Sequence, residues 1–139
     1  MRRILVVEDS ASTRSFIRSA LETGGRLGPC DIVEASSGFD ALRLLPRGPY
    51  DLVITDINMP DINGLELVRF VRQSERHREI PLLIISTQSS VRDRERGMAL
   101  GADRFLAKPF TPEALRLAVT ESLAGRTTTP GGENVGSGV

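Results

Sequence analysis

The sequence predicts an α/β fold in which five β-α units form a doubly wound, five-stranded parallel sheet. Apolar runs of strand length alternate along most of the chain with longer segments of helical periodicity, which is the pattern of β-α units around a parallel sheet. Three of these runs, Leu5–Val7, Leu52–Thr55 and Phe105–Ala107, pass directly into polar residues. Strands buried on both faces have unbroken apolar runs, so polar side chains first leave the core at the carboxyl ends of such strands.

The strands are expected at about residues 3–7, 31–35, 51–55, 81–86 and 104–107, and each leads into a helix. The first helix begins near Ser10 or Ser12, because a serine hydroxyl suits the N-cap position, and it ends at residues 24–25. Its apolar stripe consists of Phe16, Ile17, Ala20 and Leu21. Its two arginines, Arg14 and Arg18, point elsewhere.

The third and fifth helices carry clear start signals. Gly64 supplies the turn before the third helix, and Thr111, followed by proline and glutamate, offers a capping hydroxyl to the fifth. The wide apolar face of the third helix contains Leu65, Leu67, Val68, Phe70 and Val71. The inward-facing residues of the fifth helix are Leu115, Ala118, Val119 and Leu123.

The fourth helix, near residues 90–100, has few apolar residues. Val91 and Met98 are nearly its only large candidates for the core, whereas arginines alternate with acids along the rest. A helix with such a thin apolar stripe is held loosely by packing and shifts at small cost. Two interpretations fit this stripe, a solvated surface and a functional element.

Composition narrows the class of protein. The 139 residues fit one domain, expected at residues 1–124, and residues 125–139 are either a flexible tail or a linker cut short before an output domain. The 18 basic and 18 acidic residues balance, so no overall field favours nucleic acid or a membrane surface. The single cysteine, Cys30, excludes an internal disulfide and fits a reducing compartment. Because no run resembles a signal peptide or a membrane span, the expected location is cytoplasmic.

Polar residues at several strand ends are expected to meet at one point. Five β-α units usually adopt the strand order 2-1-3-4-5, which sets strands 1 and 3 side by side and places the ligand crevice beyond their carboxyl ends. Glu8, Asp9 and Asp56 then share this crevice, and Lys108 lies on its rim. Three neighbouring carboxylates require protonation or a bound cation, and such a set of oxygen ligands suits Mg²⁺ better than Ca²⁺.

The chemistry that follows is phosphoryl transfer. A carboxylate beside Mg²⁺ and an ammonium group can accept a phosphoryl group, because both cations neutralise charge on the transferred oxygens. Asp56 is the best nucleophile, since it stands alone at the end of the middle strand, whereas Glu8 and Asp9 are adjacent and better placed to hold metal. Ser86, at the end of the fourth strand, can donate a hydrogen bond to the phosphoryl oxygens.

Five motifs in the sequence are specific when taken together. They are Val-Val-Glu-Asp-Ser at 6–10, Asp-Ile-Asn-Met-Pro-Asp-Ile-Asn-Gly at 56–64, Ile-Ile-Ser-Thr at 84–87, Gly-Ala-Asp-Arg-Phe at 101–105 and Lys-Pro-Phe at 108–110. Over about residues 3–124 the chain thereby resembles the receiver domain of bacterial two-component response regulators, especially the stand-alone chemotaxis type. The resemblance implies a flavodoxin-like receiver fold. The strand order 2-1-3-4-5 is the one known from a chemotaxis receiver.

The resemblance implies a role for each acid of the crevice. Asp56 becomes the phosphoacceptor, and it binds Mg²⁺ directly together with Asp9. In the family, the backbone carbonyl at the position of Asn58 completes the protein ligands, and Glu8 acts mostly through water.

The resemblance also implies a switch. Ser86 and Phe105 resemble a pair in which the hydroxyl moves toward the phosphoryl group and the aromatic ring then rotates inward. This rotation reshapes the surface formed by the fourth helix, the fifth strand and the fifth helix, which binds a downstream protein. Lys108 contacts the phosphoryl group, and its bond to Pro109 is expected to be cis.

Asn58, Thr87 and Gln88 occupy the positions that tune reaction rates in the family. Thr87 is bulkier than the small residue often found there, so we expect it to slow access to Asp56. Neither Asn58 nor Gln88 adds an acid or a base, so hydrolysis of the phosphoryl group should be modest without a helper phosphatase.

The predicted function is a switch, in chemotaxis or motility control, that is phosphorylated by a sensor histidine kinase. The chain is not expected to be an enzyme beyond its own phosphotransfer and autodephosphorylation, nor to bind nucleic acid directly or a membrane. Alternatives are a receiver module of a larger regulator and a phosphorelay intermediate. A Mg²⁺-dependent phosphohydrolase of the haloacid dehalogenase type needs an acid where Asn58 stands, and a flavodoxin-like cofactor site needs a phosphate loop where Glu8 and Asp9 stand.

Overall fold

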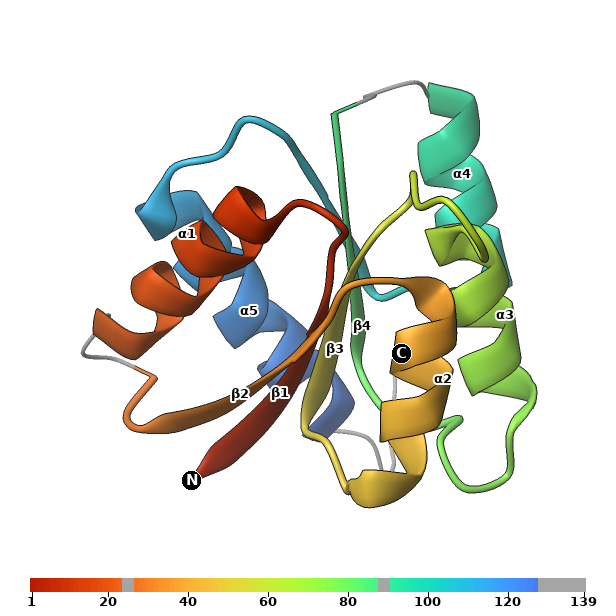
Figure 1. The fold of residues 1–139 in the computed structure, drawn as a ribbon, viewed down its shortest axis with the longest axis horizontal. Coiled ribbons are helices and arrows are strands. Elements are labelled where there is room, and N and C mark those ends of the chain that lie inside the picture. Colours follow the sequence, from red (N-terminus) through yellow and green to blue (C-terminus); the bar gives the residue numbers. More distant parts are fainter. Residues whose placement is uncertain (24–26, 88–90, 128–139) are drawn as a thin grey trace.

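The computed structural model describes residues 1–23, 27–87 and 91–127, which form a parallel sheet with helices on both faces (Figure 1). The strands are β1 (Arg2–Val7), β2 (Cys30–Ala35), β3 (Leu52–Asp56), β4 (Leu82–Ser86) and β5 (Arg104–Ala107). Their order is β2-β1-β3-β4-β5, as predicted, and each boundary agrees with the prediction to within one residue.

The register of the sheet brings the ends of β1 and β3 together. Val7, the last residue of β1, pairs with Ala35 of β2 on one side and with Thr55 of β3 on the other. Asp56 pairs in turn with Ile85 of β4. Residues that follow β1 therefore emerge beside the end of β3, at the point where the strand order reverses.

The helices form two layers. Helices α1 (Ala11–Thr23) and α5 (Pro112–Thr127) cover one face of the sheet, and α2 (Gly38–Leu44), α3 (Gly64–Gln73) and α4 (Val91–Leu100) cover the other (Figure 1). Successive strand residues enter opposite cores, so Ile4 and Val6 pack on the side of α1 and α5, and Leu5 and Val7 pack on the other side. The predicted end of α1 at residues 24–25 lies outside the described residues. No helix in the described ranges has the length and apolar character needed to cross a membrane.

Side-chain caps fix the starts of α3 and α5. The side chain of Asn63 accepts a hydrogen bond from the Glu66 backbone at 2.9 Å, and the Glu66 carboxylate accepts one from the Asn63 backbone at 3.1 Å. Gly64 is therefore the first residue of α3 and not the turn before it. At α5, Thr111 Oγ1 accepts a hydrogen bond from Ala114 N at 3.0 Å, as its capping role predicts.

Helix α5 matches its predicted inward face but is longer than expected. All of its expected core residues are buried: Leu115, Ala118, Val119 and Leu123. Its backbone continues to Thr127, three residues past the domain boundary predicted at residue 124. The rest of the predicted tail, residues 128–139, lies outside the described residues, so its flexibility stays a prediction.

Four large apolar residues are more exposed than the helical pattern predicts. The exposed fractions are 41% for Phe16, 47% for Phe70, 68% for Val91 and 43% for Met98. In α4 the reason lies in Gly97, the one buried residue described for that helix. A β-carbon at this position would lie 2.6 Å from Cδ1 of Ile84, so α4 packs on the sheet through its glycine backbone and turns Val91 and Met98 outward.

Candidate functional site

Three carboxylates meet at the carboxyl ends of β1 and β3. Glu8 and Asp9 directly follow β1, and Asp56 is the last residue of β3. One carboxylate oxygen of each residue lies within 4.8 Å of those of the other two, which confirms their predicted convergence. Glu8 and Asp56 are buried and Asp9 is exposed, so the cluster opens to solvent on one side. Oxygen ligands at this spacing fit a hard divalent cation.

The ammonium group of Lys108 lies between the two buried acids. Lys108 Nζ donates to Glu8 Oε1 at 2.6 Å and to Asp56 Oδ2 at 3.1 Å. The side chains of Lys108 and Glu8 are only 14% and 1% exposed, so water screens their attraction weakly. Lys108 is also the only lysine in a chain whose other cationic side chains are arginine or histidine. Among the side chains, the compact ammonium group of lysine therefore occurs only at this site.

The hydrogen bond between Glu8 and Lys108 affects the pKa of both side chains. Burial raises the pKa of the Glu8 carboxyl, although the hydrogen bonds from Lys108 and from the Ser10 backbone act in the opposite direction. Burial acts to lower the pKa of Lys108, but its hydrogen bonds to Glu8 and Asp56 outweigh that effect and raise it. Lys108 consequently stays cationic at neutral pH and holds a positive charge between the two carboxylates.

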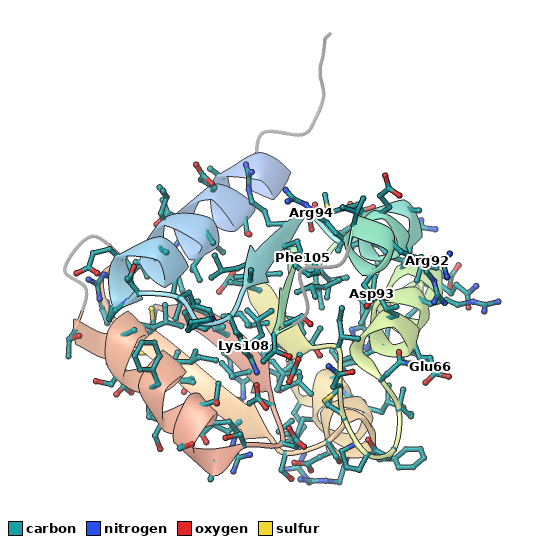
Figure 2. The ribbon with its side chains drawn as sticks, turned by 90° about the horizontal axis from the view of Figure 1, so that it is seen from above. Glu66, Arg92, Asp93, Arg94, Phe105 and Lys108 are labelled. Carbon is teal, nitrogen blue, oxygen red and sulfur yellow. The ribbon has the colours of Figure 1, made fainter. Side chains whose placement is uncertain are left out.

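The two predicted switch residues lie in neighbouring strands, Ser86 in β4 and Phe105 in β5. Ser86 is fully buried at the end of β4, and its backbone carbonyl accepts a hydrogen bond from Lys108 N at 2.7 Å. Phe105 in β5 is half-buried and packs against the core on the side of α2 and α3. Figure 2 looks onto the carboxyl ends of the strands and labels both Phe105, inside β5, and Lys108, directly after it. The peptide bond between Lys108 and Pro109 is cis, as predicted.

A groove of about 380 Å³ adjoins Lys108 on the side of α1. Its lining residues are Ser12, Thr13, Phe16, Thr87, Lys108, Pro109 and Phe110. The rings of Phe16 and Phe110 meet edge to face with their centroids 5.8 Å apart. Thr87 is exposed in the groove beside the site.

The other two predicted rate-tuning residues lie outside this groove or outside the described residues. Asn58 is exposed, and its backbone N–H donates to Asp56 Oδ1 at 3.4 Å, whereas Gln88 lies outside the described residues.

The loop between β3 and α3 is fastened to α2 by Asp61, a contact that the sequence does not predict. The backbone N–H groups of Gly38 and Phe39 donate to its two carboxylate oxygens at 3.0 and 2.9 Å. These are amides of the first turn of α2, where an anion is favoured. Asp61 lies 22 and 23 positions from its partners, so no local sequence pattern could reveal the contact.

The stability supplied by Asp61 should depend on pH. Chiefly the hydrogen bond from Phe39 lowers the pKa of this carboxyl from 3.8 to about 2. Because the pKa is lower in the folded state, the contribution is present above pH 3.8 and is lost as the pH falls through about 2. We therefore expect Asp61→Ala to lower the melting temperature at neutral pH and this difference to shrink in acid. Melting curves of both proteins across that range test this, and a difference that stays constant would contradict it.

The family model described as the response regulator receiver domain matches residues 4–120. The chain belongs to the response regulator receiver domain family. This result confirms the predicted family, and the receiver's residues at 8, 9, 56, 86 and 108 lie together in the structure as the motifs imply.

Individual relatives include chemotaxis proteins. The receiver is 37% identical to chemotaxis protein CheY1 of Helicobacter pylori over 115 residues, which cover 82% of this chain and 90% of that protein. The structure of the chemotaxis response regulator CheY4 of Vibrio cholerae matches with a TM-score of 0.80 at 32% identity, over 88% of this chain and 99% of that one. The transcriptional regulatory protein CusR of Escherichia coli is 33% identical over 108 residues, but the match covers only 45% of CusR.

Proposed function

We propose that this receiver accepts a phosphoryl group on Asp56 from a sensor histidine kinase and then binds a downstream protein. The observation that carries the proposal is the buried Asp56 carboxylate, 3.1 Å from the chain's only lysine and grouped with Glu8 and Asp9. A buried nucleophile that adjoins one cation, and also adjoins acids able to hold a second cation, is the arrangement that phosphoryl transfer requires.

The residues act together during transfer. A carboxylate oxygen of Asp56 attacks phosphorus while the bond from phosphorus to the histidine nitrogen of the donor breaks. Lys108 is placed to donate from its ammonium group to a phosphoryl oxygen, because it already contacts Asp56. Asp9, Asp56 and the carbonyl of Asn58 would hold Mg²⁺, with Glu8 acting through water, and the ion would supply charge neutralisation at the phosphoryl oxygens.

The output face is proposed to be the surface of α4, β5 and α5. In this proposal the Ser86 hydroxyl moves toward the phosphoryl group and the half-buried ring of Phe105 turns inward. Helix α4 suits such a change, because it packs through Gly97 and presents charged side chains to solvent. In Figure 2, Arg94 lies on the side of α4 nearer Phe105 and Arg92 lies on the other side.

We place the receiver in chemotaxis or motility control, in the cytoplasm, acting through protein partners and without direct binding to nucleic acid. Its similarity to CheY1 and CheY4, most of whose length it spans, supports this proposal. It would have no enzymatic activity other than its own phosphorylation and dephosphorylation. The match to CusR favours a second candidate, a receiver module of a larger regulator.

Intact mass spectrometry tests the phosphorylation directly. The protein is incubated with acetyl phosphate and Mg²⁺, alongside Asp56→Asn and a metal-free sample. The expected result is a gain of one phosphoryl group that requires Mg²⁺ and is absent from Asp56→Asn. The same gain in Asp56→Asn would reject Asp56 as the acceptor. Mass is the appropriate measurement because the chain has no tryptophan for a fluorescence assay.

Removing the bulk of Thr87 should speed both phosphorylation and dephosphorylation. Thr87 lines the groove beside Lys108, through which a donor or a water molecule would approach Asp56. We expect Thr87→Ala to raise both rates about threefold, which corresponds to about 0.7 kcal/mol in activation free energy. Time courses of the phosphorylated mass measure both rates. Ser12→Ala, in the same groove, is the control, and unchanged rates in Thr87→Ala would reject the hindrance.

A further inference from the structure

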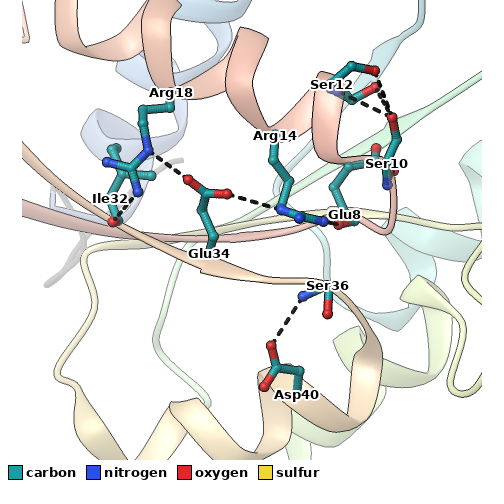
Figure 3. Close-up of polar contacts among 10 residues, drawn as sticks. Glu8, Ser10, Ser12, Arg14, Arg18, Ile32, Glu34, Ser36 and Asp40 are labelled. Carbon is teal, nitrogen blue, oxygen red and sulfur yellow. Dashed lines mark hydrogen bonds and ion pairs between the residues drawn. The ribbon is translucent and has the colours of Figure 1, made fainter.

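The side chain of Arg14 joins β2 to the loop that carries the acids of the site. Its Nε donates to Glu34 Oε1 at 3.0 Å, and its Nη1 donates to the backbone carbonyl of Glu8 at 2.6 Å (Figure 3). The Arg14 and Glu34 side chains are only 17% and 30% exposed. A charged donor on a backbone carbonyl makes a stronger hydrogen bond than a neutral donor does.

The contact completes the anchoring of Glu8. Its backbone N–H donates to the carbonyl of Ala35 at 3.0 Å, and its Oε2 accepts from the Ser10 backbone at 3.0 Å. Its Oε1 accepts from Lys108, so the backbone carbonyl is the remaining polar group, and Arg14 binds it. That carbonyl belongs to the peptide group that joins Glu8 to Asp9. Fixing the plane of this peptide therefore fixes the N–Cα bond of Asp9, the bond that leads to its side chain.

Glu34 in turn holds the guanidinium of Arg14 in place. Arg18 Nε also donates to Glu34, at 2.6 Å to the other carboxylate oxygen. The hydrogen bond from Arg18, followed by that from Arg14, lowers the pKa of Glu34, so Glu34 remains charged at neutral pH. Arg18 differs from Arg14 in its other contacts. Its Nη2 donates to the carbonyl of Ile32 at 3.0 Å, away from the acids of the site (Figure 3), and its Nη1 donates to Glu22 Oε2 at 3.1 Å.

We propose that Arg14 is a positioning residue for the metal site: by holding the carbonyl of Glu8, and itself held by Glu34, it orients Glu8 and Asp9 toward the divalent cation. This inference rests on the proposed function, since it concerns the same cation. A group that orients the ligands of a metal ion strongly affects the affinity of the site for that ion without contacting the ion itself. Arg14 carries out this role from α1, on the side of the loop facing β2.

A charge effect of Arg14 and a positioning effect of Arg14 would change the affinity for Mg²⁺ in opposite directions. If Arg14 acted only through its positive charge, removing it would make the nearby acids bind a cation more tightly. If it positions the acids, its removal weakens binding. We expect about tenfold weaker Mg²⁺ binding in Arg14→Ala, the lower end of the losses seen when a group orienting a metal ligand is removed.

The experiment is a Mg²⁺ titration of the unphosphorylated protein followed by amide chemical shifts of residues 8–10, with the melting temperature measured in parallel. Arg18→Ala is the matched control, because it removes an arginine from the same helix and from the same carboxylate. Arg14→Lys keeps a donor for one of the two acceptors, so partial recovery of affinity is expected. If Arg14→Ala does not fold, Arg14→Lys and Arg18→Lys provide the comparison.

The outcomes separate this inference from the proposed function. Weaker binding in Arg14→Ala, with Arg18→Ala near the unmodified protein, supports the positioning role. Unchanged or tighter binding in Arg14→Ala overturns it, and so does an equal loss in both variants, which would reflect the stability of α1 alone. If the unmodified chain itself binds no Mg²⁺, the proposed function fails and this inference fails with it.

Discussion

Replacing Lys108 by methionine is expected to cost about 3 kcal/mol of folding free energy in the absence of metal, the cost of removing one partner from a buried ion pair. The variant leaves Glu8 and Asp56 as two buried carboxylates without the ammonium group that contacts both. Denaturant unfolding in a chelating buffer measures this loss. Because a divalent cation can replace the missing charge, added Mg²⁺ should stabilise Lys108→Met more than the unmodified protein.

The same variant should lose phosphorylation by roughly 100-fold, the effect of removing one donor aimed at a developing charge. Lys108→Arg is the matched control, since it keeps the charge but replaces a compact ammonium with a larger planar group. We expect Lys108→Arg to recover most of the stability and little of the phosphorylation rate. Equal phosphorylation rates in all three proteins, measured by intact mass, would show that Lys108 has only a structural role.

Replacing Gly64 by alanine should also disrupt the site, through the backbone. A β-carbon at Gly64 would overlap the carbonyl oxygen of Asp56 and lie 2.8 Å from its carbonyl carbon and 2.9 Å from Cα of Ile57. The Gly64 N–H also closes this loop by donating to the carbonyl of Ile57 at 2.8 Å. Since backbone atoms cannot yield as a side chain can, we expect a loss of about 3 kcal/mol, at the upper end for overpacking.

Gly97→Ala provides the comparison for Gly64→Ala. Its added β-carbon would meet only the tips of two side chains, Cδ1 of Ile84 at 2.6 Å and Cδ2 of Leu65 at 3.5 Å, which can change rotamer. We expect a smaller loss of stability there, about 1 kcal/mol, and an unchanged rate of phosphorylation at Asp56. Denaturant unfolding and intact mass test both variants. Equal stability losses at the two glycines would contradict the distinction between backbone and side-chain overlap.

Much of the fold and of the site follows from local patterns. The strands were predicted because unbroken apolar runs of this length suit a sheet covered on both faces, and the two cores on either side of the sheet confirm it. The convergence of Glu8, Asp9 and Asp56 followed from their places at strand ends. The predicted orientation of α4, with Val91 and Met98 facing the core, was wrong. Helical periodicity assumes that apolar side chains contact the sheet, whereas the backbone at Gly97 makes this contact.

The sequence by itself determined where the strands lie, which acids follow them and to which family the chain belongs, because these features depend on neighbouring residues and on motifs. Only the tertiary structure decided that Arg14 holds the carbonyl of Glu8 from a position fixed by Glu34, and that Asp61 fastens the β3–α3 loop to α2. Arg14 and Glu8 are six positions apart in the sequence, but Arg14 and Glu34 are 20 positions apart and Asp61 and Gly38 are 23 positions apart. Charged side chains with many possible partners carry no periodicity, so only the packing of the helices on the sheet selects which of them meet.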